Sequence, residues 1–145
     1  MRKFEKVSYV ENVQLPTRAD VGSAGYDFYS PETILIQPKE AQLIKTNVKV
    51  KMNDDEVLLL YVRSSIGIKR QLMLGNGTGV IDSTYYNNPD NEGNIMIALY
   101  NYGDEAQLIN VGDRIMQGVF VKYLTTVDDK PLSDTRVGGI GSSGK

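Results

Sequence analysis

Short runs of β-branched, aromatic and aliphatic residues recur along the chain, and short turn signals separate them. The runs are "FEKVSYV", "TILIQP", "AQLIKTNVKV", "EVLLLYVR", "GNIMIALYNY" and "RIMQGVFVKYL". Between them stand turn signals such as "NDDE", "NPDNEG" and "NVGD". Many runs alternate between apolar and polar residues, which is the pattern of a half-buried β-strand. This spacing predicts an all-β chain built as a sandwich or a barrel. We expect one brief helix, with Ser64 or Ser65 as the cap before "IGIKRQ".

The length and charge of the chain limit its class. Its 145 residues predict one domain, which is long enough to bury a core without disulfides or metals. The 16 Lys and Arg residues nearly balance the 18 Asp and Glu residues, giving a net charge of −2 with no basic block. We therefore expect no direct binding of nucleic acid or of a membrane surface. With no signal-peptide pattern and no long apolar run, we expect a cytoplasmic protein.

Two missing residue types exclude several kinds of chemistry. The chain has no cysteine and no histidine. Disulfides, thiolate nucleophiles, structural zinc and Ser-His-Asp triads are therefore excluded. We expect a catalytic base to be a carboxylate, and a metal to be a hard cation such as Mg²⁺ with oxygen ligands.

Two stretches in the first half carry residues suited to an anion. In "SAGYDFYS", Gly25 permits a sharp backbone path and Asp27 lies among small and aromatic residues. In "VRSSIGIKR", Arg63 leaves an apolar run and is followed by two hydroxyls, Ser64 and Ser65. A guanidinium with hydroxyls at a helix start suits a phosphate. A turn entering a strand, and a serine cap beside a surface arginine, explain each stretch equally well when it is taken alone.

A third stretch, "LGNGTGVIDSTYYNNPDNEGNIMIALYN", places Asp82 after a glycine-rich approach. Glycines at 75, 77 and 79 let the backbone come close to a ligand. An aspartate at the edge of an apolar pocket can orient and deprotonate a water molecule, although a turn aspartate in a hairpin is the simpler alternative.

Two further stretches complete the set. The fourth, "GDRIMQGVF", presents Asp113, Arg114 and Gln117, and a salt-bridged turn would also explain it. The chain ends in "RVGGIGSSGK", which has almost nothing to bury. It is either a disordered terminus or a flap that closes over an anion.

In this order the five stretches resemble the five motifs of the trimeric dUTPase family. The resemblance runs from Ala24 to Gly144. The hairpin "YNNPDNEG" is longer than the commonest form, as in members from Gram-positive bacteria and their phages. The tail has Ile140 where the family commonly has an aromatic residue.

The resemblance implies a fold, an assembly and a reaction. The fold would be a jelly-roll β-barrel over residues 1–126, and residues 127–145 would form an arm that closes a neighbouring subunit's active site. Three chains would form a homotrimer, and each active site would take motifs 1, 2 and 4 from one chain, motif 3 from a second and the arm from a third. The reaction would convert dUTP and water into dUMP and pyrophosphate with Mg²⁺.

The resemblance also assigns roles to residues. Asp82 would activate the attacking water, Asp27 would touch the metal through water, and Asp113 would orient Arg63. Tyr85 would pack against the deoxyribose and exclude a 2′-hydroxyl, while Ile140 would cover the uracil. The substrate-binding set would be Arg63, Ser64, Ser65, Asn76, Gly79, Tyr85, Ile95, Met96, Gln117, Arg136, Ile140, Gly141, Ser142 and Ser143.

Two other functions stay open. A dCTP deaminase shares the fold and the trimer, and it would release ammonia rather than pyrophosphate. A non-catalytic relative that regulates by binding would use a protein partner, and the hairpin at Asn87 to Glu92 is where we would expect that partner.

Overall fold

The computed structural model describes residues 1–141 as a mostly β protein with two short helical turns. The strands are β1 (Lys3–Lys6), β2 (Thr17–Arg18), β3 (Tyr26–Tyr29), β4 (Ile34–Ile36), β5 (Ala41–Lys45), β6 (Val48–Lys51), β7 (Glu56–Tyr61), β8 (Leu72–Leu74), β9 (Gly79–Asp82), β10 (Met96–Asn101), β11 (Gln107–Ile109) and β12 (Arg114–Lys122). A π-type turn, η1 (Ser65–Lys69), follows β7, and a 3₁₀ turn, η2 (Ser83–Tyr85), follows β9.

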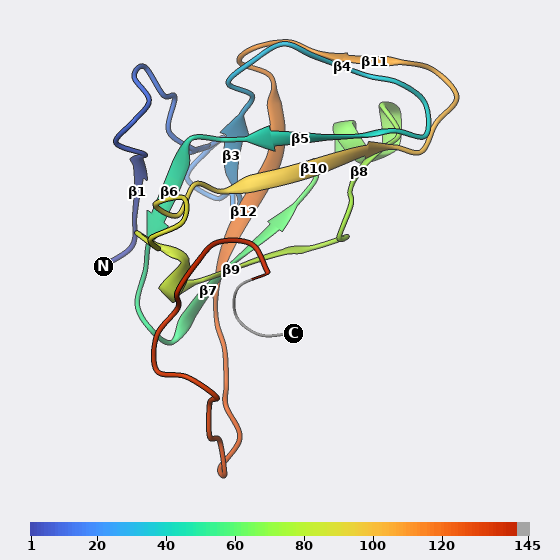
Figure 1. Ribbon diagram of the computed structural model, residues 1–145. Coiled ribbons are helices and arrows are strands. Elements are labelled where there is room, and N and C mark those ends of the chain that lie inside the picture. Colours follow the sequence, from blue (N-terminus) through green and yellow to red (C-terminus); the bar gives the residue numbers. More distant parts are fainter. Residues whose placement is uncertain (142–145) are drawn as a thin grey trace.

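The strands form four antiparallel sheets. The largest has the order β2-β3-β12-β7-β9, and a second has the order β5-β10-β8. Two ribbons, β1-β6 and β11-β4, complete the set. Figure 1 shows β5 and β10 side by side across the molecule, with the β4-β11 ribbon above them. The predicted all-β architecture is confirmed, although these sheets do not join into one closed barrel within residues 1–141.

Period-two patterning explains the core. Along β9, Gly79 and Ile81 are buried while Val80 and Asp82 are exposed. Strand β10 shows the same alternation, whereas β7 is buried over most of its length, and together the strands fill one core. It holds Phe28, Ile36, Ile44, Leu58, Leu60, Leu72, Leu74, Ile95, Leu99, Ile109, Ile115 and Met116, all almost fully buried.

Two features differ from the expected elements. The run "AQLIKTNVKV" divides into β5 and β6, because Asn47 has a φ of 63° and turns the chain between them. The expected short helix is present as η1, but Ser64 at its start makes no side-chain capping hydrogen bond. Its hydroxyl therefore does not serve as the predicted cap.

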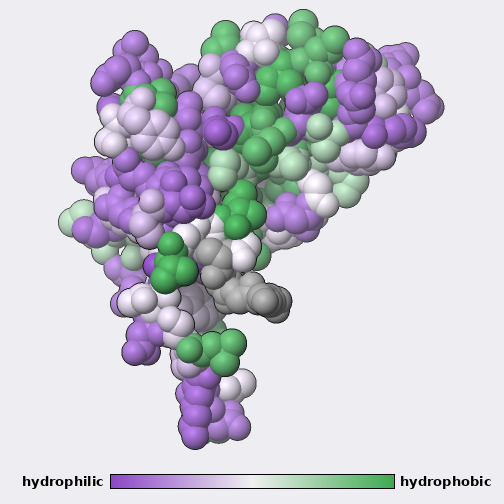
Figure 2. Space-filling view, in the orientation of Figure 1, coloured by the Kyte–Doolittle hydropathy of each residue, from purple (hydrophilic) through white to green (hydrophobic). Residues whose placement is uncertain are grey.

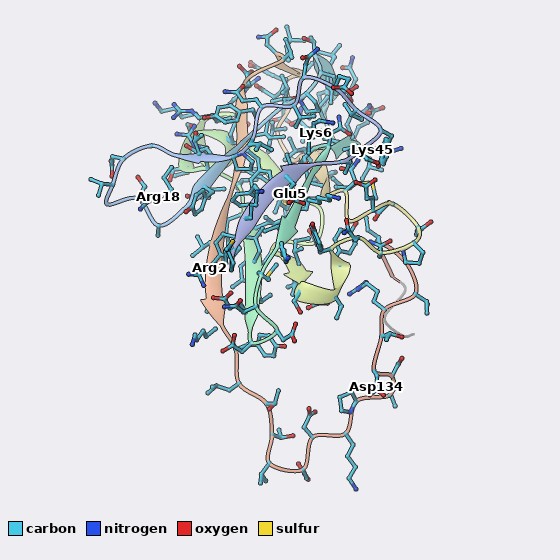
Figure 3. All side chains as sticks on the ribbon, turned by 90° about the vertical axis from the view of Figure 1, so that its left-hand side faces the viewer. Arg2, Glu5, Lys6, Arg18, Lys45 and Asp134 are labelled. Atoms are coloured by element: carbon cyan, nitrogen blue, oxygen red, sulfur yellow. The ribbon has the colours of Figure 1, made fainter. Side chains whose placement is uncertain are left out.

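After β12 the chain forms an arm. No helix or strand occurs between residues 123 and 141. The arm leaves the sheets, carries Asp134 well away from them and then returns toward β9 (Figures 1 and 3). Its last described residues lie below a face on which apolar residues gather over β5 and β10 (Figure 2). No helix in the described part of the chain is long and apolar enough to cross a membrane.

Candidate active site

One cleft lies between β9, the start of β10 and the returning arm, and we call it the hairpin cleft. Its volume is about 550 Å³. Eight of the predicted site residues line it: Asn76, Gly79, Asp82, Tyr85, Met96, Arg136, Ile140 and Gly141. These residues are up to 65 positions apart in the chain, between Asn76 and Gly141, so the fold brings them together. The hairpin cleft therefore joins the third predicted motif to the tail.

Gly79 shows why this wall of the cleft needs glycine. A Cβ atom placed there would lie 2.9 Å from both Cβ and Cδ1 of Leu60 on the paired strand β7. Real side chains do not approach that closely, so any larger residue would push β9 away from β7. Asp82, three residues further along β9, depends on that pairing for its position.

Asp82 is held by the arm of its own chain. Its Oδ2 accepts a hydrogen bond from Arg136 Nη2 at 2.8 Å, while Arg136 Nε donates to Thr84 Oγ1 at 3.3 Å. The guanidinium carbon lies 5.5 Å from the centre of the Tyr85 ring. The Arg136 side chain is only 9% exposed and that of Asp82 is 51% exposed. The carboxylate is accessible from the cleft, and its charge is balanced by an arginine that the resemblance placed in the substrate-binding set.

Tyr85 is fixed by hydrogen bonds at its hydroxyl. The side chain is buried, its hydroxyl donates to the Asn94 carbonyl at 2.9 Å, and it accepts a bond from Asn91 Nδ2 at 2.8 Å. Burial raises the pKa of the Tyr85 phenol above its ordinary value. The ring is therefore a neutral wall of the cleft with a fixed orientation.

A second cleft, which we call the arginine cleft, has a volume of about 540 Å³. The other predicted residues that it brings together are Asp27, Arg63, Ser64, Ser65 and Gln117. Strand register explains the grouping, because Gln117 of β12 is opposite Asp27 of β3 on one side and Tyr61 of β7 on the other. The two clefts share no lining residue.

Asp27 is a buried carboxylate between two arginines. Its Oδ1 lies 3.1 Å from Arg63 Nε, and its Oδ2 lies 3.5 Å from Arg114 Nη1. The Asp27 side chain is 8% exposed. Sequence reasoning noted Arg114 only as part of a turn, and no local signal marked it as a partner of Asp27. The pairing fixes both guanidinium groups beside the cleft.

The predicted orienting pair of Asp113 and Arg63 is wrong for the described chain. Asp113 instead lies 3.7 Å from Arg70 Nη1, and its Oδ2 accepts a bond from the Asn110 N–H at 2.9 Å. Arg63 takes Asp27 as its partner because β3 and β7 flank β12 in one sheet. Asp113 belongs to the turn before β12 and braces that turn.

Ile95, which the resemblance placed in the substrate-binding set, does not line the hairpin cleft, and its role stays a prediction. Ile95 is fully buried, and its N–H donates to the Val48 carbonyl at 2.9 Å. Its own carbonyl accepts bonds from the Thr46 N–H and hydroxyl at 2.9 and 2.6 Å. The Ile95 backbone therefore ties the start of β10 to β6, whereas the next residue, Met96, lines the hairpin cleft.

Ser142 and Ser143 lie outside the described residues. The structure adds Thr84, Asp90 and Asn91 to the surroundings of the hairpin cleft through their contacts with Arg136, Gly139 and Tyr85. In the sequence Asp90 and Asn91 belong to a turn signal and Thr84 carries no signal, so nothing distinguished these residues as part of a site.

The residues fit a magnesium ion that arrives with a polyphosphate. Residues 1–141 contain no group of three or more Asp or Glu side chains that could hold a metal by themselves. The two site carboxylates, Asp27 and Asp82, line different clefts. Mg²⁺ commonly uses one or two carboxylates together with water and substrate phosphates, which is a donor set that these clefts allow.

Comparisons with known proteins identify the family of the chain. The dUTPase family model matches residues 11–144. The deoxyuridine 5′-triphosphate nucleotidohydrolase of Lactococcus lactis is 43% identical over 147 aligned positions, covering 99% of this chain and 98% of that protein. The crystal structure of the dUTPase from Streptococcus mutans superposes with a TM-score of 0.79 at 40% identity, covering 85% of this chain and 97% of that one.

A phage protein shows the same fold. The dUTPase of the Staphylococcus aureus phage phi11, described with a structural Mg(II) ion, has a TM-score of 0.76 at 27% identity and covers 92% of this chain and 97% of its own. Relatives from Gram-positive bacteria and from phages are thus both present, as the resemblance implied. Family model, sequence identity and superposition agree, and the chain belongs to the dUTPase family.

Proposed function

We propose that this dUTPase-family hydrolase converts dUTP and water into dUMP and pyrophosphate, with Asp82 as the general base. The observation that carries the proposal is the hairpin cleft, which gathers an accessible carboxylate, a buried tyrosine ring and an arm arginine. Asp82 would accept a proton from a water molecule that attacks the α-phosphorus. General-base catalysis of this kind contributes about 10²- to 10⁴-fold to the rate.

The hairpin cleft would bind the nucleoside. The fixed Tyr85 ring would pack against the deoxyribose, where a 2′-hydroxyl would collide with it. Asn76 and the Met96 backbone line the same cleft and would read the uracil edge. A site that hydrogen-bonds one base rejects another whose pattern is reversed, because polar groups are then left unpaired. Cytosine has that reversed pattern.

The arginine cleft would bind phosphate oxygens. Arg63 and Arg114 are both held by Asp27, and the Ser64 hydroxyl makes no capping bond. Ser65 and Gln117 complete the polar lining. Bound Mg²⁺ would offset the charge of the triphosphate and favour its reactive shape. Asp27 would help to hold its water shell.

The separation of the two clefts supports a homotrimer. No single described chain puts Asp82 and Arg63 in one cleft. Between the clefts, the five-stranded sheet exposes apolar side chains at Tyr61, Val80 and Val121, which are 37%, 59% and 41% exposed. A second subunit packed on this face would cover those side chains and could bring its arginine cleft to the first subunit's hairpin cleft. Whether the arm serves its own or a neighbouring subunit stays a prediction, as does a cytoplasmic location.

Binding of the triphosphate would free the base. In the described chain, Arg136 Nη2 lies 2.8 Å from Asp82 Oδ2 and balances its charge. Phosphate oxygens are strong bidentate partners for arginine and would compete for the guanidinium. Arg136 would then close on the γ-phosphate and leave Asp82 free to take a proton from water.

The decisive experiment measures pyrophosphate release from dUTP, dTTP, dCTP and UTP, with and without Mg²⁺. We expect dUTP to be strongly preferred and activity to need the metal. Asp82→Asn keeps the shape of the side chain and removes the base, so nucleotide should still bind while turnover falls by about 10² to 10⁴. Near-normal turnover in this variant, or ammonia release from dCTP, would contradict the proposal.

A further inference from the structure

Both ends of Tyr85 are held by the hairpin that follows it, at residues 87–92. At the backbone, Asn88 Nδ2 donates to the Tyr85 carbonyl at 2.8 Å, and the Asn88 N–H donates to the same oxygen at 3.3 Å. At the tip of the ring, Asn91 Nδ2 donates to the Tyr85 hydroxyl at 2.8 Å. One short segment therefore fixes this residue at its backbone and at the far end of its side chain.

The Asn91 amide has its own orientation set inside the hairpin. Its Oδ1 accepts hydrogen bonds from Asn88 Nδ2 at 2.8 Å and from the Gly93 N–H at 3.0 Å. Gly93 has a φ of 90°, and a Cβ atom placed there would lie 2.8 Å from the Tyr85 carbonyl oxygen, so the chain returns directly against the Tyr85 backbone. Because two donors occupy the Asn91 oxygen, its NH₂ group points at the Tyr85 hydroxyl.

The hydrogen bonds around Tyr85 form a closed circuit. The Tyr85 hydroxyl donates to the Asn94 carbonyl at 2.9 Å, and Asn94 Nδ2 donates to the Tyr9 hydroxyl at 3.1 Å. The Tyr9 hydroxyl donates to the Asn91 carbonyl at 3.3 Å, and the bond from Asn91 Nδ2 returns to Tyr85. Tyr85 and Asn94 are 5% and 1% exposed, so water competes little for these bonds. A satisfied buried network of this kind makes the groups that it joins rigid.

Rejection of a ribose by shape depends on how firmly the Tyr85 ring is held. Tyr85 lines the hairpin cleft, where its ring is the proposed neighbour of the deoxyribose. A wall that can move aside makes room for one added hydroxyl, and apolar pockets reject such an analogue by only about 10²-fold. Groups that contact a substrate keep their geometry when a second layer of hydrogen bonds locks them. The residues that lock Tyr85 therefore influence the choice of sugar.

We propose that Asn91 is a positioning residue for sugar discrimination, because it holds the Tyr85 hydroxyl and keeps the ring where a 2′-hydroxyl would collide. The inference rests on the proposed function, since it takes the hairpin cleft as the site of the deoxyribose. Asn91 does not itself line the hairpin cleft, so it acts through Tyr85. The hairpin thereby has a part in substrate choice.

Asn91→Asp tests the donor alone. Aspartate has the shape of asparagine and keeps the oxygen that accepts from Asn88 and Gly93, but its second oxygen cannot donate to Tyr85. We expect the ratio of kcat/KM for dUTP to that for UTP to fall by about three- to tenfold, the factor for one hydrogen bond. The ratio of Kd for UMP to that for dUMP should fall by the same factor, and calorimetric titration measures it without turnover.

Asn87→Asp is the matched control. It adds the same charge to the same hairpin and keeps an acceptor oxygen for Lys49 Nζ, which lies 2.7 Å from Asn87 Oδ1. Both ratios should stay at their wild-type values in this variant. Tyr85→Phe keeps the ring and removes the hydroxyl on which Asn91 acts, so it should relax both ratios at least as much as Asn91→Asp. In that background Asn91→Asp should change neither ratio further, whereas a purely structural role would lower them again.

The outcomes separate this inference from the function on which it rests. If wild type hydrolyses dUTP and rejects UTP, but Asn91→Asp keeps both ratios, the inference is overturned and the proposed function stands. Should Asn91→Asp fail to fold, unchanged ratios in Tyr85→Phe overturn it equally. If wild type releases no pyrophosphate from dUTP, yet its preference for dUMP over UMP falls in Asn91→Asp, the positioning role stands and the proposed function fails. Equal binding of dUMP and UMP by wild type would overturn the inference, since no discrimination would then exist.

Discussion

Replacing Tyr85 with phenylalanine removes one hydroxyl from an enclosed part of the hairpin cleft and leaves the ring in place. In the native structure this hydroxyl donates to the buried Asn94 carbonyl at 2.9 Å and accepts from Asn91 Nδ2 at 2.8 Å. Asn94 is 1% exposed, so water cannot easily replace the lost donor. A buried polar group left without its partner costs about 1–3 kcal/mol. We expect Tyr85→Phe to lower the free energy of unfolding by that amount.

Tyr102→Phe is the matched control. The Tyr102 hydroxyl also donates to a backbone carbonyl, that of Gly67 at 2.6 Å, but Tyr102 is 40% exposed. Water can take the place of this donor, so we expect a loss below about 1 kcal/mol. Urea unfolding would measure both variants at one protein concentration, because assembly makes apparent stability depend on concentration. If Tyr85→Phe costs no more than Tyr102→Phe, the burial argument is refuted.

Comparison of wild type with Tyr85→Phe also predicts how stability depends on pH. Burial raises the pKa of Tyr85, so the native protein holds the phenol proton more tightly than the unfolded chain does. The resulting stabilisation is fully present below the unfolded pKa of about 10 and is lost as the pH rises through the native value. The stability difference between wild type and Tyr85→Phe should therefore shrink above about pH 10. A difference that grows with pH would contradict the assigned direction.

Two further predictions concern the arm. Ile140 lines the hairpin cleft and is 66% exposed, so Ile140→Phe should tighten binding of a non-hydrolysable dUTP analogue up to about tenfold through ring stacking, and Ile140→Gly should weaken it. Calorimetric titration would measure the affinity of both variants. Unchanged affinity in both would show that Ile140 does not lie over the uracil. Deleting residues 136–145 should leave the unfolding midpoint nearly unchanged, because the described part of this segment, residues 136–141, adds no strand, while dUTP turnover collapses. A fully active truncated chain would show that the tail is a passive terminus and has no role in turnover.

Much of the fold could be predicted from local pattern. Alternating apolar residues in "NIMIALYN" give β10, because a strand turns every second side chain to one face whatever its neighbours are, while β7 comes from the continuous apolar run "VLLLY". The short strands β2, β8 and β11 were not predicted, since two or three residues are too few to show a period. The residue inventory removed histidine and cysteine as bases and so favoured a carboxylate, and Asp82 has the accessibility that such a base needs.

Only the tertiary structure decided which charges meet. Arg63 pairs with Asp27 rather than Asp113 because the sheet order places β3 and β7 on either side of β12. The resemblance places Ile95 in the substrate-binding set, and in the fold its backbone hydrogen bonds hold the start of β10 to β6.

The sequence by itself determined the strand periods, the turns and the kinds of side chain available for chemistry. The tertiary structure decided the division of the motifs into two clefts and the hydrogen bond from Asn91 to the Tyr85 hydroxyl. The physical reason is the separation along the chain over which each effect acts. Periodicity and turn preference depend on a few neighbouring residues. Ion pairs, hydrogen bonds and close packing depend on which distant segments the sheet register brings within a few ångströms.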